Sequence, residues 1–172
     1  QGNWHIDCMC EHLHAAYMGD LPRLIINVPP RSLKSFIVSV CFPAWLLGRN
    51  PTEKIICGSY AAGLATTLSR HTRDIMLSEW YQDIFPGTVI KKDQNEKANF
   101  ETTMQGQRYA ASVGGSVTGM GGNYLLLDDP NKPDEAESET VRTHVNEWVD
   151  TTWMTRFNNA KTGKAIVIQQ RL

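Results

Sequence analysis

Apolar residues recur along this chain in two patterns, a helical period and short continuous runs. The helical period predicts helices at residues 4–18, 34–48, 61–77 and 134–157. Gly19 ends the first helix, Pro43 disturbs the second, and Trp148 is expected to pack inward from the last. The continuous runs predict buried strands at residues 23–28, 54–60, 107–113, 124–127 and 165–168, with weaker candidates at 88–93 and 98–103.

Strands and helices therefore alternate, and the best strands are apolar on both faces. This order predicts an α/β domain with a mainly parallel central sheet, because parallel strands need crossover helices that cover the sheet. Residues 114–122 contain five glycines in nine positions, so we expect a loop there. No repeat, linker or low-complexity segment divides the chain, which indicates one domain.

Composition narrows the class of protein. With 172 residues, 41% of them apolar, the chain can form one domain with a hydrophobic core. A formal net charge of −1 excludes a generally basic coat but allows a local basic patch for nucleic acid. The uncharged stretch 35–48 is shorter than the roughly 20 residues of a membrane span. The chain begins at Gln1 and ends at Leu172 after a strand-like run, so we interpret it as a fragment of a longer protein.

Four cysteines form no CxxC pair, which favours a reducing compartment. Cys8 and His12 are one helical turn apart and could share a metal ion. The alternative is favoured, because the helical period places Cys10 on the apolar face of the helix and the histidines outside it. We therefore expect no metal at this helix.

A candidate phosphate loop, VPPRSLKS, covers residues 28–35 between a predicted strand and a predicted helix. In such a loop Lys34 would reach the β- and γ-phosphates, and the Ser35 hydroxyl would coordinate magnesium. The general motif GxxxxGK[ST] has glycines where this chain has Val28 and Leu33. Taken alone, the segment therefore favours an ordinary turn.

A second candidate is the run YLLLDD at residues 124–129, a buried strand that delivers paired acids at its carboxyl end. Asp128 would hold magnesium through water, and Asp129 would orient the attacking water. Taken alone, this run is equally typical of an ordinary strand that ends in a turn and has no role at a nucleotide site. About ninety residues separate the two candidates, an order that suits an ATPase with additional strands between its motifs.

These blocks resemble the ATPase domain of phage terminase large subunits, the motors that package DNA into procapsids. The resemblance covers nearly the whole chain and is carried, in order, by RLIINVPPRSLKS, FPAWLLGRNP, Ser59-Tyr60, Phe85-Pro86-Gly87, SVGGSVTGMGGNYLLLDDPNKP and VIQQRL. It implies a three-layer P-loop NTPase fold of the ASCE type, forming a single ATPase domain over residues 1–172. The nuclease domain of the family would follow Leu172 and is absent from this chain.

The resemblance also implies cofactors and site residues. ATP and Mg²⁺ are the expected ligands, with Asp128 as the Walker B acid, Ser35 as its partner at the metal, and Asp129 as the catalytic carboxylate. Arg31 would lie close to the phosphates and share in catalysis, and Gln169 or Gln170 would sense the γ-phosphate. The nucleotide-binding residues would be Pro30, Arg31, Ser32, Leu33, Lys34 and Ser35, with Trp4 and His5 on the adenine side.

The implied partners are double-stranded DNA, a portal protein and a small terminase subunit. A homo-oligomeric ring is expected in the assembled motor, with a monomer as the alternative for the isolated chain. No membrane contact is expected; the place of action would be the host cell cytoplasm and, transiently, the procapsid portal vertex. Met120 stands where related chains often carry an arginine that is a plausible trans-acting finger. The alternatives are Arg70, Arg73, Arg108 and Arg142, and for each a solvated surface arginine is favoured.

Three other functions stay open at this point. The first is another P-loop motor, such as a helicase or a recombination ATPase. The second is a metal-dependent nuclease built on Asp128, Asp129, Asp134 and Glu135, although the last two also suit a helix N-terminus. The third is a nucleotide-binding assembly module without hydrolysis, which the missing loop glycines suggest.

Overall fold

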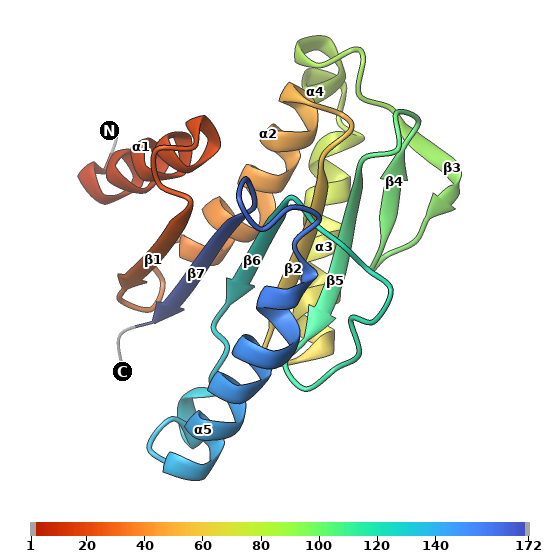
Figure 1. The fold of residues 1–172 in the computed structure, drawn as a ribbon. Helices are drawn as coiled ribbons and strands as arrows, with labels where there is room; N and C mark the ends of the chain where they lie inside the picture. Colours follow the sequence, from red (N-terminus) through yellow and green to blue (C-terminus); the bar gives the residue numbers. More distant parts are fainter. Residues whose placement is uncertain (1–2, 171–172) are drawn as a thin grey trace.

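The computed structural model describes residues 3–170, apart from the side chains of residues 94 and 95. Its centre is a seven-stranded sheet in the order β1-β7-β6-β2-β5-β4-β3 (Figure 1). The strands are β1 (Arg23–Val28), β2 (Lys54–Ser59), β3 (Ile90–Asn95), β4 (Phe100–Thr102), β5 (Gln107–Ser112), β6 (Tyr124–Asp128) and β7 (Lys164–Gln170). The first five strands in the sheet order are mutually parallel, and β4 and β3 add an antiparallel flank. The predicted α/β class with a mainly parallel sheet is confirmed.

Helices cover both faces of this sheet and give three layers. The α-helices are α1 (Trp4–Met18), α2 (Phe42–Arg49), α3 (Ala62–Met76), α4 (Glu79–Ile84) and α5 (Glu139–Trp148). Helices α1, α2, α3 and α4 contribute to the core on one face, and α5 contributes to a separate core on the other face. The sequence pattern predicted α1 to the residue but missed α4. Among the described residues, no helix combines the length and apolar character needed to cross a membrane.

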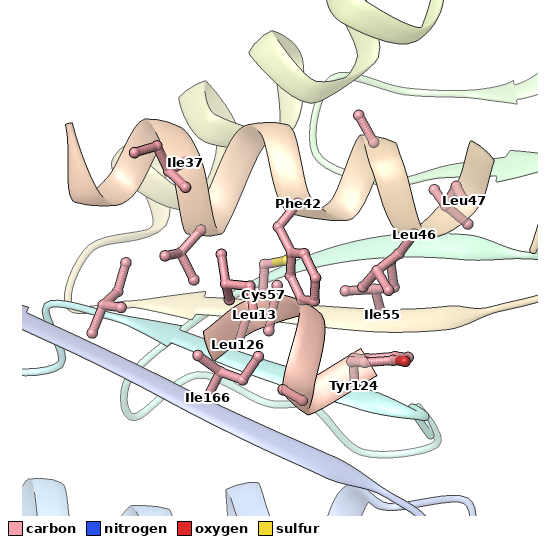
Figure 2. Packing of buried hydrophobic residues seen from close by; sticks show 14 of the residues in the cluster. Leu13, Ile37, Phe42, Leu46, Leu47, Ile55, Cys57, Tyr124, Leu126 and Ile166 are labelled. Atoms are coloured by element: carbon pink, nitrogen blue, oxygen red, sulfur yellow. The ribbon is translucent and has the colours of Figure 1, made fainter. Parts of the chain in front are cut away.

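The larger core fills the space between the sheet and the helices that follow the candidate phosphate loop. Figure 2 shows Phe42 and Leu46 of this helical segment facing Ile55, Tyr124 and Ile166 of the sheet. These side chains are almost fully buried, so their apolar area favours folding and fixes the helix against the strands. The loop at the start of that helix is consequently held in one place over the sheet.

Pro43 disturbs this helical segment as predicted. Residues Phe36–Cys41 form a π-helix, and α2 begins at Phe42. Because Pro43 has no N–H, it cannot bond to the carbonyl of Ser39, four residues earlier. That carbonyl instead accepts hydrogen bonds from Arg108 at 3.1 Å and from Thr72 at 3.4 Å. The irregular turn is thereby tied to β5 and α3.

The predicted helix over residues 134–157 is broken in the structure. A short 3₁₀ turn covers Pro133–Glu135, α5 begins only at Glu139, and π and 3₁₀ turns follow it up to Arg156. Ser138 caps α5 by accepting from the Val141 N–H, which places the helix start after the acidic run. The inward packing of Trp148 is confirmed, because only 7% of it is exposed.

Two burial predictions are wrong. Strand β1 is an edge strand, so Ile25, on the face away from α1, is 69% exposed instead of buried. On α1 the buried face consists of Met9, Leu13 and Ala16, and Cys10 lies beside it, exposed. Cys10 instead lines an apolar cavity of about 340 Å³ between α1 and the α2 segment. The helical period was correct for α1, but the direction of its apolar face differed by part of a turn.

Candidate functional site

The carboxyl ends of three neighbouring strands form the candidate site. Strand β7 lies between β1 and β6 and is parallel to both, so the loop after β1 and the acids after β6 open on the same edge. The phosphate-loop candidate leaves β1 at Val28, and Asp128 ends β6. Ligands of open parallel sheets bind at this kind of edge.

The backbone of the loop takes the left-handed conformation at two positions without glycine. Arg31 has a φ of 61° and Leu33 a φ of 62°. Leu33 stands where the general motif has its second glycine, which adopts this conformation without strain. Its carbonyl accepts from the Ile37 N–H at 2.9 Å, so the helix begins immediately after it. Leu33 therefore adopts a conformation that favours glycine, at a cost in conformational strain.

Lys34, Ser35 and the two acids meet at this edge. Lys34 is 7% exposed, and its ammonium group donates to Oδ2 of Asp129 and lies 3.9 Å from Oδ1 of Asp128. The Ser35 hydroxyl donates to the same Oδ1 of Asp128 at 3.0 Å. The structure thus brings together the four residues on which both sequence motifs depend.

Asp129 is fixed from several sides. Its backbone has a φ of 44°, and its N–H donates to the Ile168 carbonyl at 2.8 Å. Its Oδ1 accepts from the Gln170 N–H at 2.8 Å, while Oδ2 faces Lys34. The end of β7, which carries the predicted sensor residues, is therefore bonded directly to the predicted catalytic acid.

Asp128 is a buried acid with 1% of its surface exposed. Burial raises its pKa above the ordinary value for aspartate, and the charge of Asp129 acts in the same direction. The hydroxyls of Ser39 and Ser35 and the charge of Lys34 lower the pKa and oppose that effect. Such a carboxylate would gain from a further cation nearby, because a positive charge stabilises its ionised form.

Buried polar atoms without a hydrogen-bond partner gather at this edge. Within residues 3–170 they include the hydroxyls of Ser32 and Ser59, Oδ2 of Asp128, Oδ1 of Asn131 and both amide atoms of Gln169. An unpaired buried polar group costs roughly 1–3 kcal/mol. Phosphate oxygens and a hydrated cation would supply the partners, and hydroxyl and carboxylate oxygens are ligands that Mg²⁺ accepts. The residues present therefore fit a magnesium-bound phosphate.

Other predicted nucleotide contacts are less defined. Arg31 and Pro30 are exposed in the loop. Trp4 is 80% exposed and makes an edge-on contact with His5, and within the described residues neither makes a hydrogen bond or ring contact to the loop. Their adenine-side assignment stays a prediction. In the VIQQRL block, Arg171 and Leu172 lie outside the described residues.

The four arginines considered as alternatives to a finger arginine at position 120 differ in how far they are buried. Arg108 is fully buried and donates to the Ser39 carbonyl on the π-helix, so the prediction of a surface position is wrong for it. Burial lowers its pKa. Arg70 and Arg142 are exposed, and Arg142 donates to the Ala136 carbonyl at 2.7 Å. Arg73 is half-buried, 3.9 Å from Asp74. Exposure therefore leaves Arg70 and Arg142 accessible to another molecule.

The four acids of the nuclease alternative do not come together. Asp134 and Glu135 lie on the exposed 3₁₀ turn, where Lys132 approaches them at 2.7 Å and 3.5 Å. Among the described residues no three His, Cys, Asp or Glu side chains form a group that could hold a metal ion. On α1, Cys8 and His12 do approach each other, with Sγ and Nδ1 3.7 Å apart.

Sequence reasoning missed Ser39 and Ser59 in this site. Ser39 lies one turn after Ser35, and Ser59 ends β2 directly beside Asp128 in the sheet register. Both are at most 1% exposed. The available signal was a small polar residue inside or at the end of an otherwise apolar run, which is unusual for a buried segment.

No family model matches the sequence, and no curated protein matches it. Solved structures do match. The large terminase of bacteriophage HK97 has a TM-score of 0.54 at 13% identity, over 87% of this chain and 29% of its own. The ATPase domain of the Thermus phage P74-26 large terminase has the same score and identity, over 86% of this chain and 58% of its own. The N-terminal domain of the bacteriophage phi29 DNA packaging ATPase has a TM-score of 0.51 at 14% identity, over 90% and 77%.

These matches show a shared fold, and they confirm the expected three-layer P-loop type. This chain spans less than two thirds of the length of the first two matched chains.

Proposed function

We propose that this chain is a Mg²⁺-dependent ATPase domain and serves as the motor domain of a DNA-packaging terminase large subunit. The observation that carries the proposal is the meeting of Lys34, Ser35, Asp128 and Asp129 at one sheet edge. The structural likeness to ATPase domains of phage terminases supports the packaging role. The four residues lie in order on a strand–loop–helix and on a second parallel strand, as phosphoryl-transfer sites require.

Each of these residues has a task that its position suits. Lys34 would bind the phosphates, helped by Ser32 and the exposed Arg31 in the loop. Ser35 and Asp128 would hold Mg²⁺, which when bound neutralises charge on the phosphates. Phosphate binding would draw Lys34 away from Asp129, which frees Oδ2 of that carboxylate to orient the attacking water.

The end of β7 would report the state of the nucleotide. The Gln169 amide is buried and lacks a hydrogen-bond partner within the described residues, so a phosphate oxygen could bond to it. The Gln170 N–H already bonds to Asp129. A shift of Asp129 on phosphate loss would therefore be transmitted directly to β7.

By the same proposal, the motor acts on double-stranded DNA as a ring, together with a portal protein and a small terminase subunit. Its place of action would be the host cytoplasm and the procapsid portal vertex. Because Met120 carries no charge, an exposed arginine, Arg70 or Arg142, would supply the positive charge of the trans-acting finger. Trp4 and His5 would contact the adenine if α1 approaches the nucleotide.

The proposal is tested by binding of a fluorescent ATP analogue and by ATP turnover. Lys34→Ala should weaken binding about tenfold or more, because it removes a charge-assisted contact to phosphate. Asp129→Asn should keep binding but lose turnover about a hundredfold. Lys91→Ala and Asp93→Asn are the matched controls, since both residues lie on β3, far along the sheet order from β1 and β6.

If the unchanged chain and Lys34→Ala bind equally, or neither binds at millimolar ATP, the phosphate-loop assignment is wrong. If binding is normal but turnover stays absent at high protein concentration and with double-stranded DNA, the nucleotide-binding assembly module becomes the better description.

A further inference from the structure

Ser59, the neighbour of Asp128 in the sheet, has a buried hydroxyl group that makes no hydrogen bond within the described residues. Ser59 and Asp128 are paired residues of the parallel strands β2 and β6. Paired residues of adjacent strands point to the same face of the sheet, and their backbones lie about 4.8 Å apart. The Ser59 hydroxyl is therefore within reach of the Asp128 carboxylate, directly or through one water.

Ser59 and Asp128 each have a buried oxygen without a hydrogen-bond partner in the described part of the chain. Ser59 is 0% exposed, and within residues 3–170 neither its Oγ nor Oδ2 of Asp128 has a hydrogen bond. The other oxygen of the carboxylate, Oδ1, is used by Ser35 at 3.0 Å. The hydroxyls of Ser35 and Ser39 both act on Asp128 from the helical segment that follows the loop, and Ser59 offers a further hydroxyl from the neighbouring strand.

The backbone around Ser59 is rigidly tied to the site. The Ser59 carbonyl accepts from the Val113 N–H at 2.9 Å, and the following N–H, of Tyr60, donates to the Asp129 carbonyl at 3.3 Å. These bonds fix the end of β2 between β5 and the two acids. With the backbone fixed in this way, a Ser59–Asp128 hydrogen bond would form through rotation of the side chains.

We propose that Ser59 is a positioning residue for the metal site, whose hydroxyl donates to Oδ2 of Asp128 and holds that carboxylate in place when a divalent cation binds. The proposal rests on the proposed function, because the cation is the one expected between Ser35 and Asp128. Groups that orient a metal ligand in this way set metal affinity without touching the metal. Ser59 would therefore affect the metal more than the nucleotide.

The test compares Ser59→Ala with Ser112→Ala in the 172-residue chain. Ser112 pairs with Ser59 on the next strand, β5, so the control removes a hydroxyl one strand farther from Asp128. Electron paramagnetic resonance measures Mn²⁺ binding in the presence of the non-hydrolysable analogue adenylyl imidodiphosphate. Binding of the same analogue in EDTA measures nucleotide affinity without metal, and thermal unfolding measures stability without ligand.

We expect Ser59→Ala to weaken Mn²⁺ binding about tenfold while analogue affinity in EDTA stays within twofold of the unchanged chain. We also expect its Tm without ligand to rise by about 2–4 °C, because an unpaired buried hydroxyl is removed. A purely structural serine would instead lower the Tm and leave Mn²⁺ affinity unchanged. Ser112→Ala should leave Mn²⁺ affinity unchanged.

Two results would overturn the inference and leave the proposed function intact. One is Mn²⁺ affinity within twofold of the unchanged chain in Ser59→Ala, and the other is an equal loss in Ser112→Ala. If the unchanged chain binds neither the analogue nor Mn²⁺, the proposed function fails and this inference fails with it.

Discussion

The two ends of the parallel strands differ in how their buried polar groups are paired. At the amino end of β2 and β5, Thr102 is fully buried, donates to the Pro51 carbonyl at 2.5 Å and accepts from the Gly106 N–H at 3.0 Å. Thr88 is buried at the same end and donates to the Leu47 carbonyl at 3.1 Å. At the carboxyl end, Ser59 and one oxygen of Asp128 are as deeply buried but have no partner in the described part of the chain.

This difference separates buried groups whose hydrogen bonds stabilise the fold from buried groups that lack a partner, which under the proposed function a ligand would supply. A satisfied buried hydroxyl contributes to stability, whereas an unsatisfied one reduces it. Natural proteins keep few of the second kind, and these concentrate at functional sites. Removal of a hydroxyl should therefore have opposite effects on stability at the two ends of the strands.

The largest expected effect is at the amino end, at Gly106. A Cβ at this position would lie 2.3 Å from the Pro51 carbonyl oxygen and 3.0 Å from that of Glu53, both backbone atoms. Gly106→Ala should lower the free energy of unfolding by about 3 kcal/mol, because the backbone itself must move. Urea unfolding measures this change. Gly87→Ala is the control, since a Cβ there meets nothing within 4 Å. An equal loss in both variants would show that this end is not tightly packed.

The next effect concerns Thr102 itself. Thr102→Val keeps the shape of the side chain but removes both hydrogen bonds of the hydroxyl, to the Pro51 carbonyl and from the Gly106 N–H, and these two backbone groups keep only their bond to each other at 3.0 Å. We expect a loss of about 2 kcal/mol in the free energy of unfolding, with no effect on nucleotide binding. Ser59→Ala, measured in parallel without ligand, should change stability in the opposite direction. Losses of similar size in both would remove the distinction between the two ends.

The sequence predicted the strands of the sheet well because they depend on local patterns. Residues 23–28 gave β1 to the residue, and the run 124–127 gave β6 with an error of one residue. The two flanking strands were also expected as weaker candidates, at 88–93 and 98–103, with shifted ends, but their antiparallel direction was not predicted. Burial was harder to predict, because it depends on the sheet order. Nothing in the sequence RLIINV indicates that β1 is an edge strand and that Ile25 is exposed, because the strand order is set by the rest of the chain.

The site was predicted in part for the same reason. Lys34, Ser35, Asp128 and Asp129 belong to two local motifs, and the parallel sheet brings the motifs together. Ser39 belongs to no motif, and the Ser59-Tyr60 block carried the resemblance without a role at the site. Only the strand register and the helix path bring these two serines to Asp128. Arg108 was placed on the surface because arginines usually lie there, but the carbonyl released by Pro43 gives it a buried partner.

A smaller effect tests the loop, where residues without glycine take a left-handed backbone. Leu33 has a φ of 62° and is 55% exposed, so it contributes little buried area to offset its strain. Leu33→Gly should preserve nucleotide binding and change the free energy of unfolding by less than about 1 kcal/mol, since relief of strain opposes the greater freedom of the unfolded chain. Leu33→Val should lower it by about 1–2 kcal/mol, because a β-branched residue fits this conformation poorly. Equal stability of the two variants would argue against the left-handed loop.

The smallest effect is the pH dependence that Asp128 adds to the carboxyl end. Burial raises the pKa of Asp128 in the folded chain, so the folded state keeps a proton over a pH range in which the unfolded state has released it. Without ligand, this group therefore favours folding at low pH, and its contribution is lost as pH rises through the window just above the ordinary pKa of aspartate. The effect is small because Lys34 and the hydroxyls of Ser39 and Ser35 lower the same pKa.

Asp128→Asn removes this titration and keeps a side chain of the same shape. The variant should be no more stable than the unchanged chain near pH 4 and more stable near pH 7, as measured by urea unfolding at a series of pH values. Asp93→Asn, at an exposed position of β3, is the control and should not show this pattern. Among the described residues the amino end carries no buried acid, so a gain that grows with pH is expected only at the carboxyl end. A stability difference that stays constant with pH would show that Asp128 is balanced by its neighbours before any cation binds, and the contrast between the two ends would then rest on the hydroxyl groups alone.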